Sequence, residues 1–218
     1  MGIFRGPNIV TDGLVFAVDA GSERSYPGSG TTVTSLVGSN TGTLTNGVAF
    51  STDNGGTWDF DGVDDYITAS RAIATANYSA EFVFKADVNT TGTEHWLGNQ
   101  YSGSGRTIFD LWTNNTLRQF VNGSAIYGST VISTATWYHA VFTRNSSGVA
   151  YIYLNGVQDA TGTISAVVPS DLAFEIGGDT ALTRWFNGKI PLCRVYNKAL
   201  SATEVLQNFN AQKSRFGL

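Results

Sequence analysis

Apolar and polar residues alternate with a period of two along most of this chain, and this periodicity limits its fold more than any other feature. In residues 79–86, Phe82 and Phe84 fall on one face, whereas Glu81 and Lys85 fall on the other. This spacing is typical of a β-strand that buries one face. Because similar segments recur until about residue 200, the sequence predicts an all-β fold.

Short turn signals separate these segments. Asn155-Gly156 follows residues 149–154 and predicts a type I′ hairpin, because both turn positions need a positive φ that Asn and Gly accept. Two asparagines likewise join residues 106–113 to residues 116–123. About a dozen short strands at such spacing in one domain are typical of a β-sandwich or jelly roll.

Three further segments refine this prediction. Both faces of residues 136–144 carry large side chains, so we expect a central strand there. Pro191 lacks a backbone donor, so its strand should lie at an edge or carry a bulge. Ser201 and Glu204 form a capping-box pattern, which predicts one amphipathic helix over residues 202–213, packed on the sandwich.

The length of 218 residues suits a single domain. We assign residues 13–218 to this domain and residues 1–12 to an N-terminal arm. The arm carries apolar residues, which either add to a neighbouring subunit or fold back over their own sandwich. The C-terminal KSRFGL, beyond the expected helix, leaves the same two alternatives open.

Composition argues against several classes of function. A net charge of −4 and no run of basic residues argue against a nucleic-acid partner. No stretch approaches the roughly 18 consecutive apolar residues of a spanning helix, so we expect no membrane insertion.

Cys193 is the single cysteine and has apolar neighbours, which predicts a buried thiol and no intrachain disulfide. The N-terminus lacks the apolar region of a secretory signal, so we expect synthesis and retention in the cytoplasm.

Four segments carry specific patterns in a fixed order: residues 13–31, 58–67, 136–159 and 186–211. They include a W-Y-H-x-V strand, an L-N-G hairpin and a closing R-V-Y-N-x-A-L-S sequence. Together they resemble the laminin-G-like (LamG) branch of the concanavalin A-like lectin/glucanase superfamily. The resemblance implies a jelly-roll sandwich of two antiparallel sheets, the fold that the periodicity also favours.

The opening AGSERSYPGSGT and the closing ALSATEVLQNFNAQKSRFGL resemble free-standing laminin-G-like proteins of tailed bacteriophages. This resemblance implies a protein on the surface of the virion, made in the host cytoplasm, whose partners are other virion proteins or its own copies. Adhesion to cell-surface or matrix glycans is the function that we expect. Two alternatives stay open: a capsid or tail module that binds no sugar, and a carbohydrate-binding module of a secreted protein.

Glucanases of this superfamily carry a pair of catalytic carboxylates on one strand, as E-x-D-x-E or E-x-D-x-x-E. The chain has five glutamates, and none lies within five residues of another. His139 belongs to the W-Y-H strand, where a structural hydrogen bond is expected, and His95 adjoins an expected strand entrance, where packing is favoured. We therefore predict a protein without enzymatic activity.

Sugar binding needs flat aromatic faces beside amides and charged groups. Trp185 follows Arg184 in an expected loop and is the strongest candidate for a ligand contact. Trp58, Trp112 and Trp137 fall on alternating strand positions, which favours the core. The candidate ligand-binding residues are Trp185, Asp179, Arg184, Asn99, Tyr101 and Trp96.

Acidic residues in FDGVDDY suggest a metal. Asp61, Asp64 and Asp65 offer the hard oxygen ligands that Ca²⁺ prefers, and Asp179 in a second loop is a further candidate. The competing interpretation is turn chemistry, because Asp61-Gly62 is a turn dipeptide. Calcium is the single cofactor that the sequence suggests.

Overall fold

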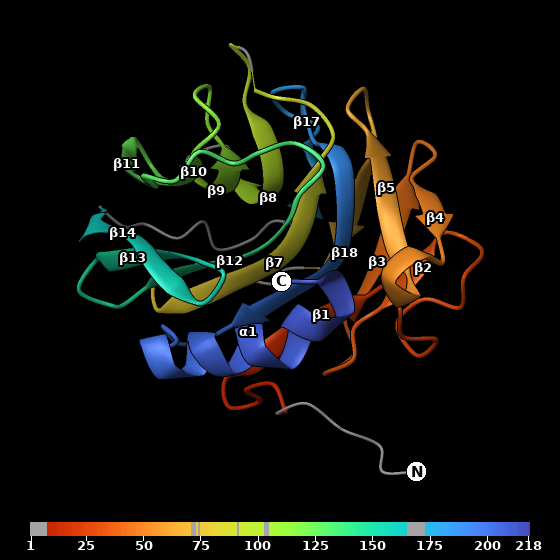
Figure 1. Cartoon of the computed structure of the whole chain (residues 1–218), viewed down its shortest axis with the longest axis horizontal. Helices are drawn as coiled ribbons and strands as arrows, with labels where there is room; N and C mark the ends of the chain where they lie inside the picture. Colours follow the sequence, from red (N-terminus) through yellow and green to blue (C-terminus); the bar gives the residue numbers. More distant parts are fainter. Residues whose placement is uncertain (1–7, 71–72, 74, 91, 103–104, 165–172) are drawn as a thin grey trace.

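The computed structural model describes residues 8–70, 73, 75–90, 92–102, 105–164 and 173–218, and the side chains of residues 101 and 102 lie outside this description. The chain forms two eight-stranded antiparallel sheets that face each other (Figure 1). Sheet A contains, in spatial order, β14 (Val157–Thr163), β13 (Val149–Leu154), β12 (Trp137–Arg144), β7 (Tyr78–Ala86), β18 (Asn187–Tyr196), β5 (Thr57–Asp61) and β4 (Ala49–Ser51), and β1 (Leu14–Asp19) also pairs with β18. Sheet B contains β11 (Ser124–Tyr127), β10 (Leu117–Val121), β9 (Gly105–Leu111), β8 (His95–Ser102), β15 (Phe174–Ile176), β6 (Tyr66–Ala69), β3 (Thr41–Thr45) and β2 (Thr32–Thr34).

This architecture confirms the predicted sandwich of two antiparallel sheets. The strand of residues 136–144 is central, because β12 pairs with both β7 and β13. Asn155 and Gly156 connect β13 to β14 with φ values of 50° and 80°, as a type I′ turn requires. Pro191 lies at a bulge of β18, between Lys189 and Leu192, and not at an edge.

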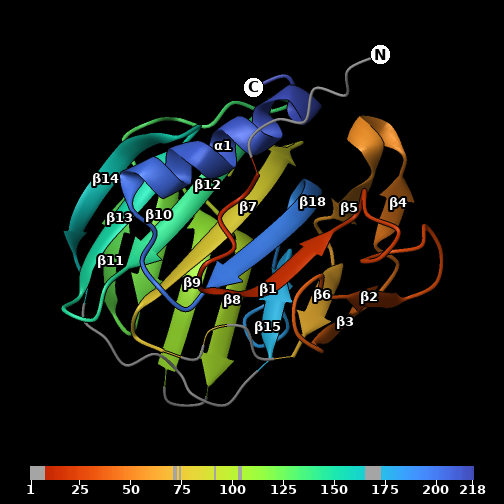
Figure 2. The same ribbon diagram turned by 90° about the horizontal axis from the view of Figure 1, so that it is seen from below.

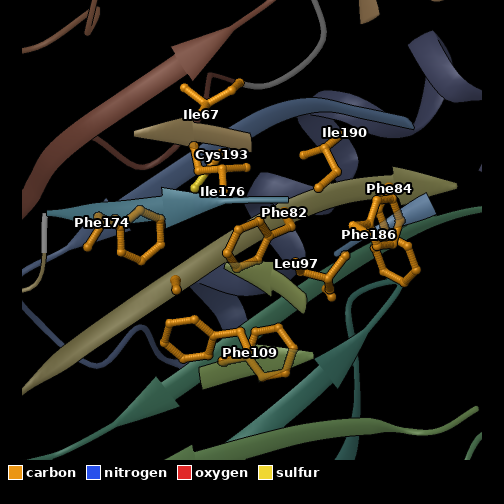
Figure 3. Packing of buried hydrophobic residues seen from close by; sticks show 14 of the residues in the cluster. Ile67, Phe82, Phe84, Leu97, Phe109, Phe174, Ile176, Phe186, Ile190 and Cys193 are labelled. Carbon is orange, nitrogen blue, oxygen red and sulfur yellow. The ribbon is translucent and has the colours of Figure 1, made fainter. Parts of the chain in front are cut away.

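The core lies between the sheets and is rich in phenylalanine. Phe82 of β7 stacks on Phe174 of β15 at a centroid distance of 6.5 Å, and Figure 3 shows both rings pointing into the same interior. Gly98 of β8 lies against this pair, and a Cβ there would be 2.7 Å from Phe82 Cζ. Phe109 contacts Phe142 across the two sheets, and Cys193 is buried in the same cluster. The alternation of β7 therefore sends Phe82 and Phe84 inward, as predicted.

One helix, α1 (Ala202–Phe216), covers part of the outer face of sheet A (Figure 2). The Ser201 hydroxyl accepts a hydrogen bond from the Glu204 backbone N–H, and the Glu204 carboxylate accepts one from the Ser201 backbone, which confirms the capping box. The helix runs to Phe216 and ends at Gly217, whose φ of 70° suits a left-handed C-cap. The other helical segment in the described part of the chain is the single turn η1 (Asp53–Gly55). No described helix is long and apolar enough to cross a membrane.

Beneath α1, a buried polar cluster attaches the helix to the sheet. The Glu81 carboxylate of β7 accepts hydrogen bonds from Arg194 Nη1 at 2.6 Å and from Asn208 Nδ2 of α1 at 2.7 Å. His139 Nε2 lies 3.0 Å from the same carboxylate, and both side chains are fully buried. His139 therefore has the structural role that the sequence predicts. Burial alone would raise the pKa of Glu81, but the charge of Arg194 and these hydrogen bonds lower it to about 2.

Two expectations about the C-terminal segment need correction. The helix is longer than residues 202–213, because Phe216 is buried against Trp137. Most of KSRFGL is therefore the last turn of α1. Residues 25–45 are rich in Gly, Ser and Thr, a composition typical of loops, but they contain β2 and β3, with Val33 and Leu44 in the core.

The described part of the N-terminal arm folds back over its own domain. The Val10 backbone N–H donates to Asn208 Oδ1 at 2.8 Å, and the Val10 side chain is buried against Tyr196 and Leu200. Of the two alternatives for the arm, residues 8–12 follow the second. Residues 1–7 lie outside the described residues.

Candidate functional site

A pocket of about 230 Å³ opens at one rim of the sandwich. It is surrounded by the turn after β5, by residues that follow β7 or precede β8, and by a short hairpin. The hairpin consists of β16 (Gly178–Asp179) and β17 (Arg184–Trp185). The start of β18 completes the wall. The lining residues are Gly62, Val88, Thr93, Glu94, His95, Thr183, Arg184, Trp185 and Asn187.

The Trp185 indole is held by its own hairpin. Gly178 pairs with Trp185 across β16 and β17, and a Cβ on Gly178 would lie 2.4 Å from Trp185 Cε3. Glycine is therefore the residue that lets the ring lie flat against the hairpin. Tyr66 of β6 contacts the ring at a centroid distance of 5.8 Å. The indole is half-buried, so it is fixed in orientation while part of it faces the pocket.

Glu94 connects the pocket to sheet B. Its Oε2 accepts a hydrogen bond from Trp96 Nε1 at 2.9 Å and lies 3.2 Å from Arg118 Nη2. Arg184 Nε, on the pocket side, is 3.9 Å from the same oxygen. The Glu94 side chain is 20% exposed and that of Arg184 is 40% exposed, so a ligand in the pocket can reach both.

His95 closes the inner side of the pocket. Burial lowers the pKa of His95, which favours the neutral imidazole near neutral pH. Its Nδ1 is buried and has no hydrogen-bond partner within the part of the chain that the structure describes. The pocket therefore combines an indole face with a guanidinium, a carboxylate and a neutral imidazole.

The structure places the six candidate ligand-binding residues in different environments. Trp185 and Arg184 line the pocket together. Trp96 is fully buried and holds Glu94 through its indole N–H, so it offers no face to a ligand. Asn99 is 1% exposed and its Nδ2 donates to the Gly178 backbone oxygen at 2.6 Å.

Of the remaining two candidates, Asp179 does not line the pocket, and the side chain of Tyr101 is not described. Asp179 is fully buried, and its Oδ1 accepts hydrogen bonds from the backbone N–H groups of Ala181 and Leu182. It therefore shapes the turn between β16 and β17. Tyr101 pairs with Arg106 in the register of β8 and β9, and its side chain lies outside the described part.

Two pocket residues, Glu94 and His95, are absent from the sequence-based set of ligand contacts. The signal that could have found Glu94 is its place two residues before Trp96, because residues two apart on a strand share a face. Its contact with Arg118 depends on strand register, which no local pattern shows.

The expected acidic cluster forms, without Asp179. Ligand atoms of Asp61, Asp64 and Asp65 lie within 4.8 Å of one another. Asp61 Oδ1 accepts a hydrogen bond from the Val63 backbone N–H at 2.8 Å, which is an Asx-type turn. The two interpretations of this motif, turn and metal, are therefore compatible.

Asp65 is the member of this cluster that fits a cation best. It is 4% exposed, its Oδ2 accepts from the Asp61 backbone N–H, and its Oδ1 has no partner among the described residues. Burial, followed by the charges of its acidic neighbours, raises the pKa of Asp65 despite that hydrogen bond. An all-oxygen set with one unsatisfied buried oxygen suits Ca²⁺. The cluster adjoins the pocket, because Asn187 lines the pocket and donates to the Asp61 backbone oxygen at 2.9 Å.

The carboxylates close to the pocket differ in their access to a ligand. Glu94 is the single carboxylate among the described lining residues. Asp110, next to it on sheet B, is fully buried and bound by Arg118 through two nitrogens. A retaining glycosidase needs two carboxylates about 5 Å apart that both reach the substrate. The pocket therefore offers stacking and hydrogen bonding with one accessible carboxylate.

Solved structures with this fold come from proteins of several kinds. Domain 4 of the extracellular GH43 arabinanase AbnA from Geobacillus stearothermophilus, in complex with arabinotriose, matches with a TM-score of 0.68 and 19% identity over 90% of this chain and 98% of that one. Trypanosoma rangeli sialidase matches with a TM-score of 0.70 and 16% identity over 95% of this chain. The receptor-binding domain of botulinum neurotoxin type G matches with a TM-score of 0.69 and 16% identity over 92% of this chain. The match covers 34% of the sialidase and 52% of the toxin domain.

Sequence comparison is consistent with the fold. No curated protein sequence matches the chain. A family model described as the concanavalin A-like lectin/glucanases superfamily, of the laminin-G type, matches residues 60–206, which include the acidic cluster, the pocket residues and most of both sheets. The chain therefore belongs to the concanavalin A-like lectin/glucanase superfamily.

Proposed function

We propose that this protein is a non-enzymatic glycan-binding module whose binding site is the rim pocket. The observation that carries the proposal is the fixed, half-buried Trp185 indole beside Arg184 and Glu94 in one cavity. An indole face stacks on the C–H face of a sugar ring, while charged and amide groups at its edge accept and donate hydrogen bonds to hydroxyls. The 230 Å³ cavity suits one sugar unit.

The structural neighbours support this proposal. One of them is a domain of an arabinanase with bound arabinotriose, and another is the receptor-binding domain of a toxin. The first holds a bound sugar, the second is described as a receptor-binding domain, and they share the fold at 16–19% identity. The superfamily also contains glucanases, but their catalytic carboxylate strand motif has no counterpart in this sequence.

Calcium is part of the proposal as a structural ion. Asp61, Asp64 and Asp65 would hold it, and Asp65 would give it the oxygen that has no other described partner. An ion there would fix the turn that carries Gly62, one wall of the pocket. We therefore expect calcium to strengthen glycan binding through the shape of this wall.

The biological setting that we propose is the surface of a phage virion, where many copies would make a weak sugar contact strong through avidity. The resemblance of the first and last segments to phage proteins supports this setting. Mass spectrometry of purified particles tests it: stoichiometric copies agree with a virion protein, whereas their absence favours a module of a secreted protein.

A glycan array, probed with the purified protein in Ca²⁺ and in a chelator, tests the binding function. We expect a specific signal that Trp185→Ala and Arg184→Ala each lower by about tenfold or more. Arg24→Ala is the matched control, because Arg24 is exposed and lies away from the pocket. Thermal unfolding of each variant shows whether the fold is kept. A blank array with multivalent protein would overturn the proposal and favour a module that joins capsid or tail subunits.

A further inference from the structure

A second aromatic surface lies next to the pocket, on the outer face of sheet B. One residue from each of four neighbouring strands lies in a row across this sheet. The row consists of Trp96 on β8, Asp110 on β9, Arg118 on β10 and Tyr127 on β11. Trp112 follows β9 directly, and its ring lies over this row. Whereas α1 contacts strands of sheet A, no described helix packs on this row.

The Trp112 ring rests on a fixed cation. Arg118 Cζ is 3.8 Å from the centroid of the Trp112 ring, which is the distance of a stacked guanidinium. Arg118 Nε donates to Asp110 Oδ1 at 3.0 Å, and Nη2 donates to the other oxygen of the same carboxylate. This bidentate pair leaves the guanidinium little freedom. One face of the indole thus rests on the guanidinium, and part of this half-buried ring is exposed.

The backbone of Trp112 is also restrained. Its N–H donates to the Thr116 backbone oxygen at 2.8 Å, and its carbonyl oxygen accepts from the Asn115 backbone N–H at 2.8 Å. The Thr90 hydroxyl donates to the same carbonyl oxygen. Tyr127 contacts the indole edge-on at 5.9 Å between centroids and is 48% exposed. The two rings therefore form a rigid aromatic surface, which costs a ligand little ordering entropy.

This surface is continuous with the rim pocket. Arg118, which lies under Trp112, is 3.2 Å from the Glu94 carboxylate, and Glu94 lines the pocket. The indole and the pocket wall are thus about one guanidinium group apart. A ligand that fills the pocket and continues along sheet B would next meet the Trp112 ring.

We infer that Trp112 and Tyr127 form a second sugar-binding position, so that the ligand is an oligosaccharide that occupies the rim pocket with one unit and stacks another on Trp112. This inference rests on the proposed glycan-binding function. A protein partner would need about 800 Å² on each side, whereas the surface consists of one indole, one phenol and the half-buried Phe120 beside Arg118. A single sugar ring matches an area of this size.

Indole N–H signals in the ¹⁵N-labelled full chain give a direct test, because the chain has five tryptophans. The probes are a glycan identified on the array, in its monosaccharide, disaccharide and tetrasaccharide forms. We expect the monosaccharide to shift the Trp185 signal, and the longer forms to shift the Trp185 and Trp112 signals. Trp58 is fully buried in the core between the sheets, so its signal serves as an internal control. Trp112→Phe and Trp137→Phe identify two of the five signals.

Affinity measurements complete the test. We expect Trp112→Ala to weaken tetrasaccharide binding by about tenfold and to leave monosaccharide binding unchanged. Trp137→Phe is the control, because Trp137 is half-buried on the opposite sheet. Tetrasaccharide binding by Trp112→Ala equal to the unsubstituted protein, with loss in Trp185→Ala, would overturn the second position and keep the pocket. Loss in Trp112→Ala with no effect of Trp185→Ala would instead overturn the pocket as the binding site.

Discussion

Each sheet carries an arginine–carboxylate pair across neighbouring strands on its outer face, and the two pairs differ in what covers them. In sheet A, Arg194 binds Glu81 beneath α1, and Asn208 of the helix donates to the same carboxylate. In sheet B, Arg118 binds Asp110, and the ring of Trp112 lies over the arginine. The first cluster attaches an element of the fold, whereas the second supports one half-buried aromatic side chain.

The pKa values of the two carboxylates reflect this difference. Burial acts on both, but in Glu81 it is outweighed by Arg194 and the surrounding hydrogen bonds, so the pKa falls to about 2. In Asp110 burial dominates, and although Arg118 opposes it, the nearby Glu94 charge adds to it, so the pKa rises to about 7. Asp110 is thus a costly group to bury. A charged group that is costly to bury and attaches no helix to the fold is typical of a functional surface.

The largest effect is expected from the sheet A cluster. Glu81→Gln leaves Arg194 and the His139 ring without a buried anion, and we expect a loss of about 3–5 kcal/mol of unfolding free energy. Chemical denaturation measures it. Glu23→Gln, an exposed glutamate, is the control and should change stability by less than about 0.5 kcal/mol. A loss below about 1 kcal/mol in Glu81→Gln would show that α1 does not depend on this cluster.

The pH dependence should have opposite sign in the two clusters. Because the folded pKa of Glu81 lies below its ordinary value, its stabilisation is present at neutral pH and is lost as the pH falls from about 4.5 towards 2. Because the folded pKa of Asp110 lies above its ordinary value, this group lowers stability as the pH rises from about 4 to 7. Either slope is at most about 1.4 kcal/mol per pH unit.

Unfolding titrations of the unsubstituted chain, Glu81→Gln and Asp110→Asn at several pH values separate the two slopes. The difference between the unsubstituted chain and Asp110→Asn should change between pH 4 and 7, and the difference from Glu81→Gln should change below pH 4.5. A constant difference across both windows would mean that neither carboxylate titrates abnormally, and the contrast between the clusters would disappear.

The sequence predicts well what depends on neighbours along the chain. Alternation places Phe82 and Phe84 inside, Ser201 and Glu204 cap the helix, and the acidic cluster forms because Asp61, Asp64 and Asp65 lie in one turn. These features follow from local geometry, which residue type and spacing largely determine.

The sequence predicts poorly what depends on register between distant strands. Glu94 and Arg118 are far apart in the chain and meet because β8, β9 and β10 align Trp96, Asp110 and Arg118, with a bulge after Trp96. The same register buries Trp96, a candidate ligand contact, and leaves Trp112, expected in the core, half-exposed. A shift of one residue would turn the side chains of the shifted strand to the opposite face of the sheet.

The smallest effect is expected from the acidic cluster of Asp61, Asp64 and Asp65. Unlike the two arginine–carboxylate clusters, this cluster contains no arginine. No ion pair joins these residues to a lysine or arginine in the described part of the chain, and the calcium ion that we propose there would balance their charge. At a Ca²⁺ concentration ten times its dissociation constant, binding adds about 1.4 kcal/mol. For a chain of this size that raises Tm by about 3–6 °C. Asp65→Asn should abolish the rise, because Asp65 carries the unpartnered oxygen, whereas Asp53→Asn, an exposed acid outside the cluster, should keep it. Equal melting curves in Ca²⁺ and in chelator would assign the motif to turn formation alone.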